Sequence, residues 1–277
     1  MRKKILVALL KYALALLAAV IILFPIYWMI ISAFKAPNEI LTYPPKLIPS
    51  KFTFDNFVTA FRDYNMLHIT INSVIVTLST MVLTITISAF AGYAMCFFQF
   101  APAKAINSLM YLIQVLPAVT MLVPLFALYR IMGLLNTYTS LILTYTAATT
   151  GIPIALVMIC GYYQGTPMEL FESASIDGSG PTQTFFKILL PLAAPGLFCT
   201  AIYIFVQTWQ EYMFASNLIT DSSMYTLPVG LQIFVGMRST DWGGMMATAT
   251  VVAVPAIILF VCIQKHFVDN LAGAVKE

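Results

Sequence analysis

The sequence predicts an all-α polytopic membrane protein with six transmembrane helices. Of its 277 residues, 60% are hydrophobic and only 9% are charged, whereas soluble domains carry about 25% charged residues. The mean hydropathy is +0.89. Six apolar segments approach or exceed the roughly 20 residues that cross a bilayer. Each must be helical, because lipid cannot satisfy free backbone polar groups.

The predicted spans cover residues 12–33, 69–98, 105–132, 138–163, 195–217 and 243–264. The second is longer than a bilayer requires, so we expect it to tilt or protrude. Prolines inside spans remove a backbone hydrogen bond and favour kinks. They stand at Pro25, Pro117, Pro124, Pro153 and Pro255.

The first span begins after a basic N-terminus that resembles a secretory signal peptide, with Ala13-x-Ala15 as the cleavage site. Cleavage is therefore an alternative. However, the 22 residues from Tyr12 to Ala33 carry no charge, which is longer than the apolar core of a signal peptide. We interpret this segment as a retained span.

The distribution of basic residues predicts the orientation. Six spans place both termini on one side, and Arg2, Lys3, Lys4 and Lys11 place that side in the cytoplasm. With this topology eight basic residues lie inside and six outside. The expected location is the cytoplasmic cell membrane, crossed several times.

The composition also excludes some classes of partner. The net charge is only +3 and the basic residues form no stripe, so nucleic acid is not expected as a partner. Cys96, Cys160, Cys199 and Cys262 lie in or beside apolar runs without CxxC spacing. We therefore interpret them as small apolar residues, and neither disulfides nor a zinc site is expected.

The first outer segment, residues 34–68, contains four prolines followed by KFTFDNFVTAFRDY. This stretch, residues 51–64, predicts a short amphipathic helix on the membrane surface.

The polar stretch ESASIDGSGPTQTFFKILLP, residues 172–191, lies between the fourth and fifth spans. Residues 169–176 predict a short helix, which Gly178 can end in the left-handed conformation. Pro181 suits the first turn of a second helix. One interpretation is an ordinary amphipathic loop, and Asp177 beside the glycine is also typical of a simple turn.

The spacing of Glu172, Gly178 and the Ile-x-Leu-Pro ending resembles the EAA signature of permease subunits in binding-protein-dependent ABC importers. The resemblance implies a cytoplasmic coupling loop, residues 164–194, that fits a groove on an ATPase subunit. Glu172 would make the charged contact. The residues implied are Glu172, Ser173, Ala174, Asp177, Gly178, Ile188, Leu190 and Pro191.

Further stretches are similar to the maltose-type, carbohydrate-importing branch of this family. They are Phe54–Phe57, Asn72-Ser73, Thr208–Tyr212, Thr226–Leu231, Gln264–Val268 and Gly273–Lys276. Gln210 and Asn270 depart from the usual Asn and Gly. The tail of Gly273, Ala274, Val275 and Lys276 resembles one that touches the ATPase pair.

The resemblance implies an ABC importer type I permease architecture in a single domain over residues 1–277. It also implies the partners: a second homologous permease, two ATPase subunits, an external solute-binding protein and a carbohydrate substrate. The chain has no GxxxxGK[ST] phosphate loop. We therefore expect it to bind no cofactor, with ATP and Mg at the partner ATPase.

No catalytic set can be assembled from the two histidines, His68 and His266, so an intramembrane enzyme is disfavoured. A secondary transporter or channel is the alternative function. It normally shows repeated halves or several charges within its spans, whereas Glu211 is the only charge well inside a predicted span.

Glu211 lies roughly 9 Å inside the outer end of the fifth span. A carboxylate there requires a wet cavity or a polar partner. We expect Gln207 to share its helical face, with Gln210 adjacent. These residues either line a sugar path or bond to the partner permease. Tyr225 and Trp242 either contact the binding protein and its sugar or anchor the membrane interface.

Overall fold

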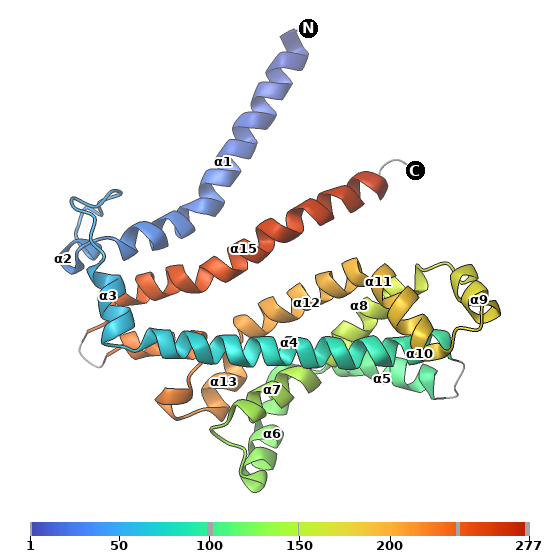
Figure 1. Cartoon of the computed structure of the whole chain (residues 1–277). Coiled ribbons are helices and arrows are strands. Elements are labelled where there is room, and N and C mark those ends of the chain that lie inside the picture. The colour runs from blue at the N-terminus through green and yellow to red at the C-terminus, as the bar shows by residue number, and fades with distance from the viewer. Residues whose placement is uncertain (1, 99–101, 149, 237–238, 275–277) are drawn as a thin grey trace. The chain divides into compact units, whose positions relative to one another are not determined.

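The structure is a computed structural model that describes residues 2–98, 102–148, 150–236 and 239–274 (Figure 1). Apart from one isolated bridge between Val235 and Thr240, the regular elements of this described part are helical. The helices in chain order are α1 (Arg2–Ala33), α2 (Pro37–Ile40), α3 (Asp55–Arg62), α4 (Met66–Phe97), α5 (Ala103–Val115), α6 (Ala118–Met132), α7 (Tyr138–Ala147), α8 (Ile152–Gln164), α9 (Glu169–Ile176), α10 (Pro181–Thr184), the π-helix η1 (Phe185–Leu189), α11 (Leu190–Leu192), α12 (Ala194–Trp209), α13 (Met213–Leu218), η2 (Ser222–Met224), α14 (Leu227–Gly230), η3 (Leu231–Phe234) and α15 (Trp242–Ala274).

Three of the predicted spans are continuous helices: α1, α4 and α15 contain apolar stretches long enough to cross a membrane. The α4 helix has 32 residues, as the long second span predicted. Pro25 and Pro255 lie inside α1 and α15 without ending them, and proline is common within membrane helices.

The third and fourth predicted spans are each divided into two helices, a larger interruption than the kinks expected from their prolines. The third is divided into α5 and α6, with a bend of 101° between them, and the fourth into α7 and α8, with a bend of 46°. Pro117 explains the first break, since it has no N–H group and forces Leu116 into extended backbone. At the second, a side chain on Gly151 would collide with the carbonyl groups of Tyr145 and Thr146.

The fifth span also differs from the prediction. The α12 helix follows the Pro181–Leu192 segment at a bend of 73° and ends at Trp209, and α13 begins at Met213. Residues 210–212 are therefore not helical. With each bent pair taken as one span, the described residues contain up to six spans.

The described chain divides into two compact units. The first comprises Met1–Leu67 with Leu231–Phe260, and the second comprises His68–Gly230 with Val261–Glu277. The single domain expected over residues 1–277 stays a prediction.

The first unit is organised around a buried lysine that follows α1. Lys35 is fully buried, lies 3.9 Å from the centroid of a Trp28 ring, and donates from Nζ to the Lys46 carbonyl oxygen at 2.6 Å. Asn56 of α3 donates to the carbonyl oxygens of Ala33 and Lys35. The predicted short helix is thus confirmed as α3, and an asparagine of the Phe54–Phe57 stretch holds it against the end of α1.

The second unit contains two hydrophobic clusters. One joins α6, α7, α13 and α14 around Tyr145, Phe214 and Leu218. The other joins the end of α4 to α8, α9 and η1 around Tyr163, Phe171 and Phe185. The second cluster carries the polar stretch that the sequence singled out.

Candidate functional site

The polar stretch forms a helical hairpin whose limits match the prediction. The α9 helix spans Glu169–Ile176, and Gly178 follows it with φ +79°. The Gly178 N–H donates to the Ser175 carbonyl, and the Ser179 N–H donates to the Ala174 carbonyl. These two bonds form a Schellman C-cap, which requires a left-handed residue at this position. Pro181 then opens α10.

The predicted coupling residues of α9 divide between two faces. Glu172, Ser173, Asp177 and Gly178 are exposed, whereas Ala174 is buried. Ala174 therefore packs the hairpin against the unit and does not present a contact surface. The exposed face also includes Ile176, whose exposed fraction of 86% was not singled out from the sequence. An apolar side chain beside a carboxylate suits a protein-binding surface.

Ile188, Leu190 and Pro191 lie outside the hairpin, in η1 and α11. Leu190 packs against the cluster around Tyr163 and Phe185. Ile188 is partly buried and Pro191 is exposed. These residues lie where the hairpin continues into α12, and a π-helix is a frequent feature of functional sites.

Aromatic contacts attach the hairpin to the end of α4. The rings of Phe97 and Phe171 have centroids 4.2 Å apart, and those of Tyr93 and Phe185 lie 5.1 Å apart. The Tyr93 hydroxyl donates to the Pro181 carbonyl at 3.0 Å. Because tightly packed aromatic rings resist small relative displacements, a displacement of the hairpin would be transmitted to α4.

A hollow of about 440 Å³ lies between this end of α4 and the hairpin. Glu172, Ile176 and Ser179 line it together with Phe97 and Phe171. The candidate contact residue thus stands at the edge of a partly apolar depression.

Glu211 lies in the non-helical break between α12 and α13. Its carboxylate accepts from the Tyr145 hydroxyl at 2.6 Å and from the backbone N–H groups of Phe214 at 2.9 Å and Ala215 at 3.2 Å. The carboxylate is therefore satisfied inside its own chain, where it caps α13. A shared helical face with Gln207 was expected, and this was wrong because α12 ends at Trp209.

The two neighbouring glutamines form their own polar group. Gln210 donates to the Gln207 side-chain oxygen, and Gln207 donates to the Tyr203 hydroxyl, each at 3.0 Å. Gln207 is partly buried and Gln210 is exposed. Amide and hydroxyl groups grouped in this way can exchange hydrogen bonds with the hydroxyls of a polar solute.

The two aromatic candidates differ in exposure. Tyr225 is partly buried, and its hydroxyl donates to the Thr220 carbonyl at 3.4 Å. Trp242 opens α15 with 40% of its surface exposed. The tail residues Gly273 and Ala274 end α15, and nothing is described of their side chains. Val275 and Lys276 lie outside the described residues.

Two stretches that were singled out separately in the sequence meet in the second unit. The Asn72 amide donates to the carbonyls of Ser223 and Tyr225, and the Ser73 hydroxyl accepts from the Leu227 N–H at 2.6 Å. His68 Nε2 lies 2.8 Å from the Ser223 carbonyl oxygen. Asn72-Ser73 therefore ties α4 to the start of α14, which no sequence spacing could indicate.

Three continuous apolar helices and three bent helix pairs in the described residues indicate a multi-pass membrane protein. A model of the family described as "Binding-protein-dependent transport system inner membrane component" matches residues 84–272. This is more than half of the chain, which therefore belongs to that family. The membership supports the predicted importer permease over a secondary transporter or channel.

Relatives match over almost the whole chain. The probable ABC transporter permease protein YurM of Bacillus subtilis is 39% identical over 258 residues, 92% of this chain and 84% of that protein. The trehalose/maltose transport system permease protein MalG of Thermococcus litoralis is 34% identical and covers 100% of this chain and 99% of its own length. These relatives are permease proteins, so the chain is a transport subunit and not an enzyme.

The fold also matches a solved structure, that of a bacterial ABC transporter involved in the import of the acidic polysaccharide alginate. The TM-score is 0.85 at 17% sequence identity, over 96% of this chain and 98% of the other. At this identity the likeness is one of fold.

Proposed function

We propose that this chain is the membrane-spanning permease subunit of an ATP-driven importer that passes a carbohydrate from an external binding protein into the cytoplasm. Family membership supports the importer, and the full-length similarity to a trehalose/maltose permease supports the sugar. The observation that carries the coupling mechanism is the α9–α10 hairpin, an exposed element joined to the ends of α4 and α12.

The hairpin would dock on one of two ATPase subunits, which supply ATP and Mg, since the chain has no phosphate loop. Glu172 would make the charged contact and Ile176 an apolar one. The tail after Gly273 would touch the same ATPase pair. A second, homologous permease would complete the transport path across the bilayer.

Alternating access would follow from the connections of the hairpin. Movement of the ATPase pair displaces α9, and the Phe97–Phe171 contact passes the displacement to α4. In this mechanism Gln207, in the last turn of α12, and Gln210, in the break that follows, would contact the sugar, because irregular backbone in a membrane protein lines cavities. Tyr225 and Trp242 would contact the binding protein or anchor the outer interface.

Uptake by the assembled transporter tests the function. With the second permease, the ATPase subunits and the binding protein in vesicles, we expect ATP-dependent accumulation of an oligosaccharide such as trehalose or maltose. Glutamine serves as the control solute. Accumulation of glutamine alone, or sugar uptake that does not need ATP, would contradict the proposal.

The proposed orientation places both termini in the cytoplasm, with the chain in the cytoplasmic membrane. Arg2, Lys3, Lys4 and Lys11 support it through the positive-inside rule. We expect a topology reporter fused after Gly180 to be cytoplasmic and one fused between Ser222 and Thr240 to be external. The reverse pattern would overturn the docking role, because the hairpin would then face away from any ATPase.

A further inference from the structure

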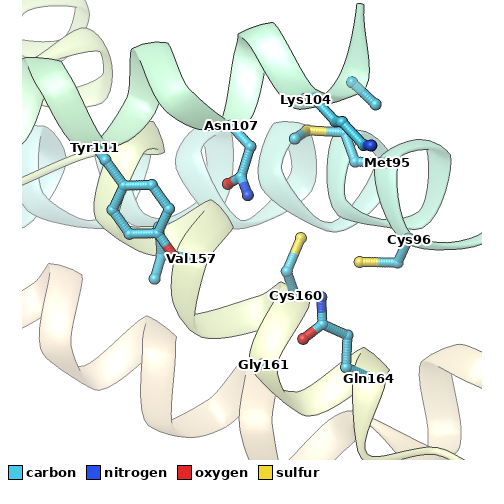
Figure 2. Close-up of a pocket in the computed structure, with 10 residues that line it drawn as sticks. Met95, Cys96, Lys104, Asn107, Tyr111, Val157, Cys160, Gly161 and Gln164 are labelled. Atoms are coloured by element: carbon cyan, nitrogen blue, oxygen red, sulfur yellow. The ribbon is translucent and has the colours of Figure 1, made fainter. Parts of the chain in front are cut away.

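A second hollow, of about 360 Å³, lies between α4, α5 and α8 (Figure 2). It is distinct from the hollow beside Glu172, and the three helices around it belong to the second unit over these residues. Lys104, Asn107 and Gln164 provide a polar lining, and all three are exposed. The hollow therefore has a partly polar lining.

Two cysteines line this hollow from neighbouring helices. Figure 2 shows the side chains of Cys96 on α4 and Cys160 on α8 in the same hollow, with the Cys96 sulfur directed toward Cys160. Both cysteines are free and partly buried. Cys199, on α12, does not line this hollow.

We propose that Cys96 and Cys160 form a reversible redox site that a peroxide-class oxidant converts into a disulfide. One thiol, as its thiolate, attacks the peroxide oxygen to give a sulfenic acid and release water or an alcohol. The second thiolate attacks the sulfenic sulfur, forms the S–S bond and releases water. The two thiols lose two electrons and two protons, and the peroxide takes up both.

The position of the two cysteines determines how a disulfide between them would affect the motion of the hairpin. Cys96 is the residue before Phe97, which ends α4 and packs on Phe171 of α9. Cys160 lies in the last turns of α8, which leads into the same hairpin. A covalent bond between them would hold α4 and α8 together at the base of the hairpin and block relative motion there. This effect on transport rests on the proposed function, whereas disulfide formation does not.

The test treats the assembled transporter in vesicles with hydrogen peroxide and follows two signals. Mass spectrometry detects a linked peptide containing both cysteines, and ATP-driven sugar uptake is measured on the same vesicles. We expect the linked peptide to form and uptake to be lost, and dithiothreitol to reverse both changes. C96S and C160S should each form no linked peptide and keep uptake after peroxide, while the matched control C199S behaves like the wild type.

Absence of the linked peptide in the wild type would overturn the redox site. Unchanged peroxide sensitivity in C96S and C160S would overturn its link to transport, as would a linked peptide with undiminished uptake. If the untreated vesicles accumulate no sugar, the proposed function fails, and the linked peptide still decides whether the thiol pair is a redox site.

Discussion

Gly178→Val is expected to uncouple ATP hydrolysis from uptake while leaving membrane insertion intact. The Schellman turn holds Gly178 at φ +79°, and a left-handed conformation costs an L-residue roughly 1–2 kcal/mol, more with a β-branched side chain. The hairpin would relieve this strain by giving up the turn that sets α10 against α9. The ATPase would then meet a misplaced contact surface.

Gly180→Val is the matched control for this substitution. A side chain at either glycine meets nothing within 4 Å, but Gly180 has φ −72° and ψ 164°, an extended conformation that valine adopts readily. Co-purification of the ATPase and binding-protein-stimulated ATP hydrolysis provide the measurement. If both variants couple like the wild type, the hairpin is only a linker between α8 and α12.

Glu211→Leu is expected to reduce the yield and thermal stability of the assembled permease, with uptake falling in parallel. The substitution removes the carboxylate that accepts hydrogen bonds from the Tyr145 hydroxyl and from two N–H groups of α13. The Tyr145 side chain is buried, with an exposed fraction of 3%. A buried donor left without a partner costs about 1–3 kcal/mol. Glu211→Gln keeps a side-chain acceptor oxygen, so we expect a smaller loss.

A second substitution separates this explanation from a role in solute contact. Tyr145→Phe in the Glu211→Leu background removes the stranded hydroxyl and should recover part of the lost melting temperature, a non-additive effect typical of directly bonded groups. Gln210→Leu, at the exposed neighbouring position, serves as the control. Wild-type yield and melting temperature in Glu211→Leu would show that the observed cap is dispensable.

Local features were predictable from the sequence because their physical causes are local. The α9 limits, the left-handed Gly178 and the start of α10 at Pro181 follow from backbone preferences of single residues. The positions of the apolar segments follow from bilayer thickness and the need to satisfy backbone groups. A short helix within residues 51–64 follows from apolar residues spaced three and four positions apart, at Phe54, Phe57, Val58 and Phe61.

The sequence indicated a kink at Pro117, but the size of that bend and the breaks at Gly151 and after Trp209 were decided by tertiary structure. Pro117 follows the end of a helix, whereas Pro25 and Pro255 lie inside helices, so a proline in an apolar segment does not by itself fix where the helix stops. From the sequence, we expected Glu211 to bond to a group outside its own chain. Nothing in the sequence indicates that Tyr145, 66 residues earlier, lies beside it. Cys96 and Cys160, 64 positions apart in the sequence, likewise come to line one hollow only through packing. Sequence periodicity reports which face of one element is apolar, and only the packing of elements decides which polar and reactive groups meet.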